Sequence, residues 1–174
     1  MTSRDAFDLR VLLLWVSISG VSFEPVAPIH VNVLRDFLSE VDLTLAGLDD
    51  PAVRLWIERD VDGRIIGSTG YELSSDRMNA LVRSVAVAPA HRTAGAGTRL
   101  AKFALMDAAC CGATRAWQFS RRSGPFWQKL GFQAADREEL ALVLPHANQV
   151  RLFTESGQLE REIAWSRPLD DLSQ

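Results

Sequence analysis

The chain has 174 residues, of which 47% are hydrophobic and 24% are charged, and its formal net charge at pH 7 is −3. This length fits one domain with a buried core, and the apolar content excludes an intrinsically disordered chain. An isoelectric point near 5.6 argues against a nucleic-acid-binding protein that depends on positive charge. Because no apolar run approaches the roughly 18 residues of a membrane-spanning helix, we expect neither a nucleic acid nor a membrane as partner.

The first residues form an apolar segment ahead of the predicted domain. Arg4 and Arg10 precede the apolar run Val11–Ile18. This arrangement resembles the start of a signal peptide, although the cleavage pattern that follows it is weak. The two alternatives to a signal peptide are an apolar strand and an upstream extension that the domain does not need. We predict an N-terminal extension at residues 1–20 and a single domain at residues 21–174.

The spacing of the cysteines and histidines predicts neither a disulfide nor a metal site. Cys110 and Cys111 are adjacent, and neighbours in sequence rarely meet the geometry of a disulfide. We therefore expect small, packed thiols in a cytoplasmic protein. His30, His91 and His146 lie far apart in sequence, and no pair has metal-ligand spacing, so we predict no metal.

Hydrophobic periodicity predicts alternating strands and helices. The predicted elements are a strand at Val21–Pro25, a helix at Val31–Val41, a short helix or loop at Thr44–Asp50, strands at Val53–Glu58, Arg64–Leu73 and Ala80–Val87, a helix at Gly97–Ala109, a strand at Arg115–Phe119, a helix at Gly124–Leu130, a strand at Phe132–Ala135, a mostly helical segment at Arg137–Thr154 interrupted near Pro145, and a strand at Glu162–Ser166. This order predicts one α+β domain around a mixed sheet.

The stretch of residues 84–109 carries the clearest chemistry. A predicted strand is stopped by a proline, and a turn rich in glycine and alanine then opens into a helix. Backbone N–H groups in such a turn point into one concavity, and the helix N-terminus adds about half a positive charge. Gly95 and Gly97 permit close approach of the backbone, and Arg92 can pair with phosphate oxygens. The stretch therefore predicts a diphosphate-binding turn.

Two other phosphate-binding motifs do not match. A Walker loop ends in Gly-Lys-Ser/Thr, whereas Gly97 is followed by Thr98 and Arg99. The dinucleotide fingerprint requires a small residue where Leu100 stands and an acidic residue at the end of the next strand. The strand predicted at Arg115–Phe119 has no acidic residue.

Two segments carry a family pattern. Val87–Gly97 reads V-A-P-A-H-R-T-A-G-A-G, and Gly124–Phe132 reads G-P-F-W-Q-K-L-G-F. The first resembles the V-x-P-x-x-R-x-x-G-x-G/A signature of the GNAT superfamily of acetyl-CoA-dependent N-acetyltransferases. The second resembles the short helix of that family, which ends in K-x-G-F. The resemblance covers Val21 to Leu169. Within the superfamily, the chain most resembles the branch of amino-acid and arsenic-resistance-associated acetyltransferases.

The resemblance implies a fold and a cosubstrate. The fold would be a central, mixed, mostly antiparallel twisted sheet of six to seven strands, flanked by helices and splayed between strands four and five. The cosubstrate would be acetyl-CoA, with its pyrophosphate on the turn amides, its pantetheine arm along a strand and the short helix packed against that arm. The residues assigned to acetyl-CoA in this way are Val85, Ala86, Val87, Arg92, Thr93, Ala94, Gly95, Ala96, Gly97, Thr98, Trp127 and Lys129.

The catalytic groups depart from the family pattern. Many members carry a tyrosine on the short helix that protonates the departing thiolate, and Trp127 stands at that position here. An indole N–H donates a hydrogen bond but does not titrate usefully. The single tyrosine, Tyr71, lies in mid-strand, and alternation places Glu72 on the opposite strand face. We predict Glu72 as the general base, with a solvated or ion-paired strand carboxylate as the alternative, and Ser123 and Ser120 as candidates to hydrogen-bond the thiolate.

Basic residues gather where the acceptor substrate would lie. Arg121 and Arg122 follow a strand end, and with Arg83 they would form a cationic mouth that selects a carboxylate. Their alternatives are solvation or contact with the cofactor phosphates. His30 borders the usual substrate loop of the family, although a lone histidine is more often structural.

These patterns predict an N-acetyltransferase that moves acetyl directly from acetyl-CoA to a primary amine of a small molecule. Two alternatives stay open. One is acetylation of a protein N-terminus or lysine, and the other is a non-catalytic acyl-CoA-binding or sensing module, which the missing tyrosine makes credible. A homodimer is also left open.

Overall fold

The computed structural model describes residues 22–170. In chain order the elements are β1 (Glu24–Pro25), η1 (Pro28–His30), α2 (Val31–Glu40), β2 (Val53–Arg59), β3 (Ile65–Leu73), β4 (Asn79–Val87), η2 (Pro89–His91), α3 (Ala96–Cys110), β5 (Arg115–Phe119), α4 (Gly124–Lys129), β6 (Gln133–Ala135), α5 (Arg137–Val143), α6 (Asn148–Glu155), η3 (Leu159–Arg161) and β7 (Ala164–Pro168). The predicted helix–break–helix near Pro145 is confirmed by α5 and α6. The segment Thr44–Asp50 forms turns and not a helix.

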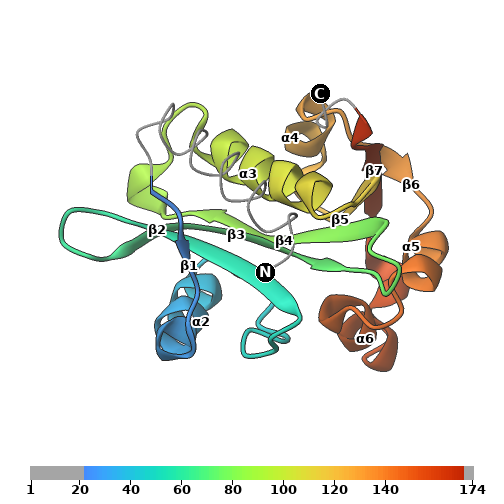
Figure 1. Ribbon diagram of the computed structural model, residues 1–174, viewed down its shortest axis with the longest axis horizontal. Coiled ribbons are helices and arrows are strands. Elements are labelled where there is room, and N and C mark those ends of the chain that lie inside the picture. Colours follow the sequence, from blue (N-terminus) through green and yellow to red (C-terminus); the bar gives the residue numbers. More distant parts are fainter. Residues whose placement is uncertain (1–21, 171–174) are drawn as a thin grey trace, which may run out of the picture.

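One seven-stranded sheet organises the domain (Figure 1). The strand order is β1-β2-β3-β4-β5-β7-β6. The β4–β5 pair is parallel and the other five pairs are antiparallel. The predicted fold class, a mixed and mostly antiparallel sheet flanked by helices, is therefore confirmed.

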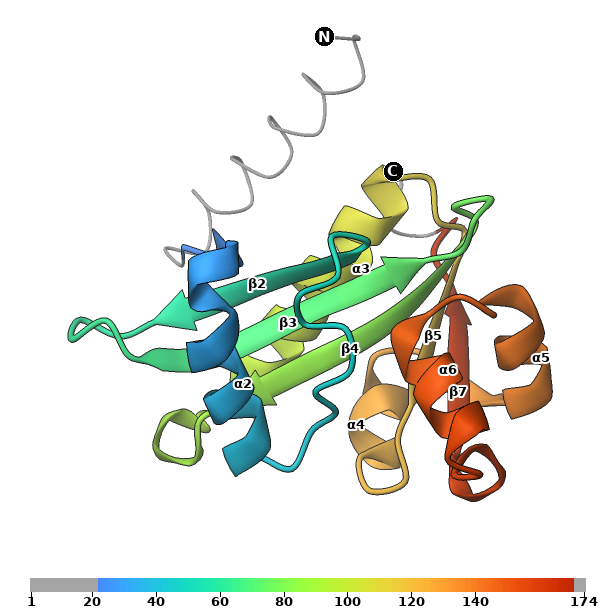
Figure 2. The ribbon, with the colours of Figure 1, turned by 90° about the horizontal axis from the view of Figure 1, so that it is seen from below.

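Helices cover both faces of this sheet. Figures 1 and 2 show α3 and α4 on one face and α2, α5 and α6 on the other. On the first face α3 buries Leu100, Phe103 and Ala104. On the second face α2 buries Leu34 and Leu38. Because both faces are covered, β4 carries buried side chains on each.

The β2–β3 connection is a hairpin turn held by its own side chains. Asp60 Oδ1 accepts hydrogen bonds from the backbone N–H groups of Asp62 and Arg64, each at 2.9 Å. Gly63 adopts a φ of 80°, which glycine accommodates without strain. An Asp-Gly pair between two strand patterns is a typical hairpin signal, and the turn forms at that pair.

The parallel strands β4 and β5 part soon after they meet. Their pairing covers three positions and ends at Leu81, which lies opposite Trp117. Beyond that pair β4 continues to Val87 and β5 to Phe119. The splay expected between the fourth and fifth strands is confirmed, and it leaves backbone hydrogen-bonding groups on the facing edges of both strands.

Three further expectations concern the N-terminal extension, a membrane-spanning helix and a metal site. The predicted extension at residues 1–20 lies outside the described residues, so the division from a domain at 21–174 stays a prediction. Between residues 22 and 170, no helix has the length and apolarity needed to cross a membrane. In the same range, no group of histidine, cysteine, aspartate and glutamate side chains is placed to hold a metal ion.

Tyr71 is buried in the layer between the sheet and α3. Its hydroxyl donates to Asp107 Oδ2 at 2.5 Å and lies 3.5 Å from Cys111 Sγ. Arg54 Nη1 reaches the same sulfur at 3.0 Å. Burial, together with the negative charge of Asp107, raises the pKa of Tyr71 far above its usual value. This hydroxyl is therefore a structural donor and not a readily ionised acid.

A pH titration followed by tyrosinate absorbance tests the state of Tyr71, and the signal is unambiguous because the chain has one tyrosine. We expect no tyrosinate in the folded protein at pH 10 to 11, with folding checked by circular dichroism, and a midpoint near 10 in guanidinium. Since only the unfolded chain then loses the proton, the free energy of unfolding falls as the pH rises above about 10. A folded-state midpoint near 10 would contradict the buried pair.

Candidate functional site

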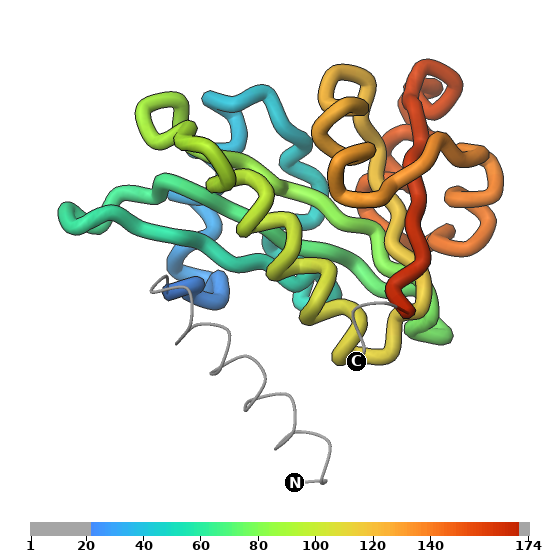
Figure 3. Tube along the Cα trace, turned by 90° about the horizontal axis from the view of Figure 1, so that it is seen from above, coloured from blue at the N-terminus to red at the C-terminus, as the bar shows by residue number. Residues whose placement is uncertain are grey.

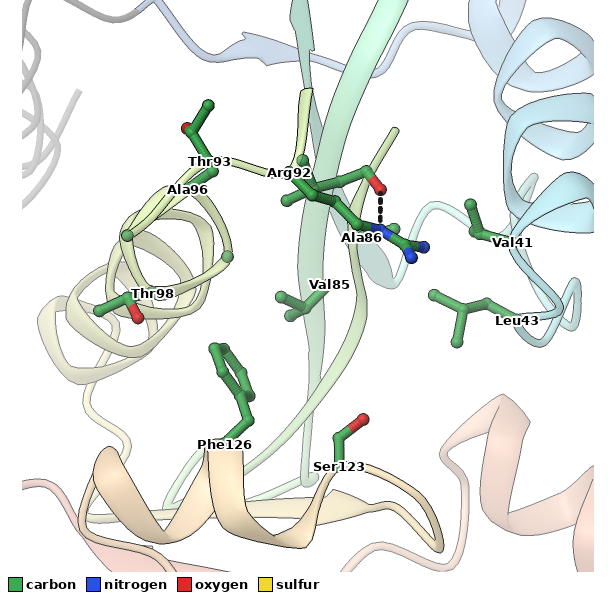
Figure 4. Close-up of a pocket in the computed structure, with 13 residues that line it drawn as sticks. Val41, Leu43, Val85, Ala86, Arg92, Thr93, Ala96, Thr98, Ser123 and Phe126 are labelled. Carbon is green, nitrogen blue, oxygen red and sulfur yellow. Dashed lines mark hydrogen bonds between the residues drawn. The ribbon is translucent and has the colours of Figure 1, made fainter. Parts of the chain in front are cut away.

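Three segments distant in sequence border a cavity in the middle of the sheet, where the end of β4 has parted from β5. Seen from above, the loop before α3, the loop after α2 and α4 lie along the end of the sheet at which β4 finishes (Figure 3). The cavity has a volume of about 430 Å³ and also borders the end of β4 (Figure 4). Its lining residues are Val41, Leu43, Val85, Ala86, Val87, Arg92, Thr93, Gly95, Ala96, Gly97, Thr98, Ser123 and Phe126.

The first turn of α3 presents backbone donors to this cavity. Among residues 22–170, no acceptor pairs with the N–H groups of Gly95, Gly97 or Thr98. Gly95 is the N-cap and has a φ of 88°, a conformation that favours glycine. Arg92 Nε donates to the carbonyl oxygen of Val87 at 3.2 Å, and its guanidinium extends over the cavity (Figure 4). The donors, the helix N-terminus and the guanidinium together fit an anionic diphosphate.

Most residues that the sequence assigns to acetyl-CoA lie together here. Ala94, Trp127 and Lys129 are the exceptions, since they do not line this cavity. Trp127 lines the neighbouring cavity instead, and Lys129 is exposed on α4.

A bulge distorts β4 at the level where β5 has moved away. Ser68 lies opposite Ala86, but Gly70 lies opposite Arg83, so β4 carries an extra residue between these pairs. Ser84 has a φ of 57°, which is unfavourable for a non-glycine residue. Ser68 Oγ holds the strained residue by donating to the Ser84 carbonyl oxygen at 2.6 Å. Such a bulge turns the backbone of the open β4 edge toward the gap, and nothing in the sequence signals it.

A second cavity, of about 450 Å³, continues from the first. The two share Val41, Leu43, Val85, Ser123 and Phe126. The residues that line the second cavity alone are Asp42, Thr44, Gln118, Phe119, Ser120, Arg121, Arg122, Trp127, Gln149, Leu152, Phe153, Gln158 and Glu162. The two spaces therefore meet beside β4 and the start of α4.

Tight packing fixes α4 at this junction. A Cβ on Gly124 would approach the Trp165 ring to 2.7 Å, so the helix can sit this close only with glycine there. Trp127 is 2% exposed and packs edge-on against Phe126 at 5.0 Å and Phe132 at 5.1 Å. It acts as a wall between the core and the second cavity.

Glu72 and Arg83 form a buried ion pair on the α6 side of the sheet. Their exposed fractions are 4% and 1%, and Arg83 Nη1 lies 2.9 Å from Glu72 Oε2. Glu72 Oε1 accepts from the backbone and side-chain nitrogens of Asn148 at 2.7 and 2.9 Å. Burial lowers the pKa of Arg83, opposed by the charge of Glu72.

These contacts bear on the role expected of Glu72. Both carboxylate oxygens are engaged by protein groups, and Glu72 lines neither of the two cavities. The geometry therefore favours the ion-paired alternative, and the general-base role stays a prediction.

The structure separates the three arginines that were expected to form a cationic mouth. Arg83 is not at the mouth, because its pairing with Glu72 holds it in the interior. Arg121 and Arg122 do line the second cavity, but each faces a carboxylate. Arg121 Nε lies 3.3 Å from Glu162 Oε1, and Arg122 Nη1 lies 3.0 Å from Asp42 Oδ2.

His30 lies away from both cavities. Its Nδ1 accepts from the backbone N–H of Ala27 at 3.2 Å, and its Nε2 lies 3.2 Å from Glu24 Oε1. These contacts anchor the turn that leads into α2, which is the structural alternative for a lone histidine.

Comparisons with known proteins agree with this architecture. A family model described as the acetyltransferase (GNAT) family matches residues 23–132. A comparison with curated protein sequences finds no significant match. Among solved structures, an acetyltransferase of the GNAT family from Staphylococcus aureus is 13% identical with a TM-score of 0.67, covering 86% of this chain and 99% of that one. An acetyltransferase from Streptococcus agalactiae is 18% identical with a TM-score of 0.60, covering 86% and 99%.

A larger enzyme is also similar. N-acetylglutamate synthase from Neisseria gonorrhoeae, complexed with coenzyme A and N-acetyl-glutamate, is 21% identical with a TM-score of 0.66. The match covers 86% of this chain but 35% of the synthase, so the chain spans about a third of that protein's length. At these identities the structural likenesses establish the fold alone.

The parted sheet with a donor-lined helix N-terminus defines an acyltransferase fold. By the match of its sequence to the family model, the chain belongs to the GNAT family of acetyltransferases.

Replacement of the buried arginine tests the ion pair. We expect Arg83→Met to lower the free energy of unfolding by about 3–5 kcal/mol, because it leaves the buried carboxylate of Glu72 unpaired. The measurement is urea denaturation of Arg83→Met, Glu72→Gln and the double variant. The double variant should lose clearly less than the sum of the two single losses. Additive losses, or a loss below about 1 kcal/mol for Arg83→Met, would contradict a buried, coupled pair.

Proposed function

We propose that the chain is an N-acetyltransferase that moves acetyl from acetyl-CoA to a primary amine of a small molecule. One observation carries the proposal. A cavity lined by unpaired backbone donors joins a second cavity at the open edge of β4. A two-substrate transfer needs this arrangement, in which the donor and the acceptor approach from different sides and meet at one place.

The residues of the first cavity fit acetyl-CoA. The N–H groups of Gly95, Gly97 and Thr98 and the guanidinium of Arg92 would bind the pyrophosphate. The open edge of β4 at Val85–Val87 would pair with the amide-bearing pantetheine arm. The coenzyme A bound to the similar N. gonorrhoeae synthase supports this assignment.

The chemistry requires one bond to form and one to break. The amine nitrogen attacks the thioester carbonyl carbon, the C–N bond forms, the C–S bond breaks, and coenzyme A leaves as its thiolate. The proton that the amine loses passes through water to that thiolate. Main-chain N–H groups at the β4 bulge are the donors we propose for the carbonyl oxygen, whose negative charge increases during the attack.

Ser123 is the residue that we propose to assist the leaving group. It is exposed, lines both cavities, and is held by a 2.9 Å hydrogen bond from its backbone N–H to Ser120 Oγ. A thiol has a pKa near 8.5, so its thiolate departs near neutral pH without full protonation. A hydrogen bond from the serine hydroxyl is therefore sufficient where the family tyrosine is replaced by Trp127.

The other candidate functions remain distinguishable. Trp127 at the position of the usual proton donor favours the sensing module, which would bind acetyl-CoA without turning it over. A protein acetyltransferase would act on peptides and not on small amines. Thiol release from acetyl-CoA over a panel of small amines and peptides separates all three.

We also propose that residues 21–174 form the catalytic domain and that the protein is cytoplasmic. All residues that line the two cavities fall within residues 41–162, so a chain lacking residues 1–20 should still bind acetyl-CoA. A cytoplasmic location would give the enzyme access to acetyl-CoA.

Thermal stabilisation by acetyl-CoA tests the first cavity. We expect a clear rise in the melting temperature of the wild-type protein, lost in Gly97→Trp because the indole would fill the cradle. Gly97→Ala is the matched control, since its Cβ would meet the Phe126 ring at an acceptable 3.4 Å. Arg92→Glu should weaken binding at least about tenfold, and Arg64→Glu, exposed in the β2–β3 turn region, should not. An unshifted wild-type melting temperature would overturn the cofactor assignment.

Steady-state kinetics test Ser123. We expect Ser123→Ala to lower kcat about tenfold while the KM for acetyl-CoA stays within a factor of two, because a leaving-group interaction acts in the transition state. Ser156→Ala, an exposed serine at the end of α6, is the control. A wild-type kcat in Ser123→Ala would refute the assignment.

A further inference from the structure

The interior of the second cavity carries negative charge, although two arginines lie at its surface. From this we propose that the acceptor is an amine carrying a second cationic, hydrogen-bond-donating nitrogen group, as in a diamine, and not an amine carrying a carboxylate. The inference rests on the proposed function, because it assigns the acceptor class of the same site.

Unpaired amide groups line the interior of the cavity. Gln149 is 8% exposed, and its Oε1 is buried without a hydrogen-bond partner among the described residues. Gln118 Oε1 is buried and unpaired in the same way. Both residues line the second cavity, from α6 and from β5. A buried polar atom without a partner is costly, so these two amides indicate a polar ligand group at this place.

Glu162 determines which kind of ligand group fits. An ionised carboxylate only accepts hydrogen bonds, whereas a glutamine amide can offer either its oxygen or its NH2 group. Glu162 lines the cavity with a side-chain exposure of 9%, and within residues 22–170 its one charged partner is Arg121. The carboxylate with two amide oxygens therefore forms an acceptor-rich pocket for N–H donors.

The burial of each charged side chain determines the sign of the charge that a ligand meets inside the cavity. Asp42, Glu162, Arg121 and Arg122 are its charged lining residues, two of each sign. The side chains of Arg121 and Arg122 are 56% and 79% exposed, so water screens them, while Glu162 is enclosed. A ligand that enters the cavity therefore meets negative charge inside, which disfavours a carboxylate there.

Aromatic walls complete a site for a cationic chain. Phe119 and Phe153 meet edge to face at 5.3 Å, and Trp127 lines the same cavity. Aromatic faces attract cations and cover methylene groups. Gln149 and Glu162 line the second cavity alone, whereas the reacting amine must reach the shared junction at Val85 and Ser123. The second nitrogen group would thus lie at the end of the cavity away from acetyl-CoA.

Three amines with the same four-carbon chain test the proposal by thiol release from acetyl-CoA. They are 1,4-diaminobutane, butylamine and 4-aminobutyrate, which differ in the group at the far end. We expect kcat/KM for 1,4-diaminobutane to exceed that for each of the others at least about tenfold, beyond the twofold factor from its two equivalent amines. Equal values, or a preference for 4-aminobutyrate, would overturn the inference.

Two substitutions show whether the named residues are responsible. Glu162→Gln and Gln149→Leu should each lower kcat/KM for 1,4-diaminobutane about tenfold, mainly through KM, and should leave butylamine within about a factor of three. Glu162→Gln should also improve 4-aminobutyrate, because Arg121 loses its carboxylate partner. Glu155→Gln and Gln133→Leu, both exposed and outside the cavity, are the matched controls. Equal losses with butylamine would contradict specific recognition of the second group.

Binding separates failure of this inference from failure of the proposed function. If acetyl-CoA binds but no amine is acetylated, calorimetric titration of 1,4-diaminobutane into the protein saturated with coenzyme A still tests the pocket. Binding that Glu162→Gln weakens about tenfold would support the pocket without catalysis. Absence of diamine binding would overturn the inference, whereas absence of stabilisation by acetyl-CoA would overturn the proposed function.

Discussion

The parting of β4 from β5 is the constraint on which the rest of the site depends. Two parallel strands that pair over three positions and then separate leave backbone donors and acceptors without strand partners, and such groups must be satisfied by something else. Beside this opening α4 packs closely through Gly124 against Trp165, and β4 bulges at Ser84. The open edge becomes a place where a ligand with its own amide groups can complete the sheet.

A cluster of polar side chains, buried at Glu72 and Arg83 and half-buried at Asn148 and Asp50, ties α6 to the sheet beside this opening. Asn148 donates to Glu72 and, at 2.8 Å, to Asp50, while Glu72 pairs with Arg83 on β4. The hydrogen bond from Asn148 lowers the pKa of Asp50, so the loop carboxylate stays ionised and bound. This cluster joins α6, which lines the second cavity, to β3, β4 and the loop after α2. The position of the cavity wall is therefore tied to the sheet, although Glu72 and Arg83 are remote from the cavity surface.

The sequence was most informative where local rules decide the structure. The hairpin at Asp60–Gly63, the break near Pro145 and the glycine-rich turn before α3 depend on residues close together in the chain, and each forms as those residues indicate. Alternation also placed Tyr71 and Glu72 correctly on opposite faces of β3. Alternation does not predict which residues of other elements contact the side chains on each face. Glu72 meets Asn148 across 76 positions of sequence, and this long-range contact makes a buried ion pair out of a residue that, by sequence, was a candidate base.

The same limitation applies to the acceptor side. Glu162 and Gln149 carried no motif, and they become neighbours of one cavity only through the packing of α6 and the segment before β7 on the sheet. The exposed Arg121 and Arg122 stood out in the sequence because charges are visible there, whereas the depth of a charge is a property of the fold. The strained Ser84 was equally hidden, since a serine inside an apolar strand gives no sign of a positive φ.

We propose that the open β4 edge and the first turn of α3 together hold acetyl-CoA. A titration of the 15N-labelled protein with coenzyme A, followed by the amide resonances, tests this binding mode. We expect saturable shifts concentrated at Val85–Val87 and at Gly95, Gly97 and Thr98, with the β2–β3 hairpin at Asp60–Gly63 unaffected. Binding that leaves those amides unshifted, or shifts centred elsewhere on the domain, would contradict it.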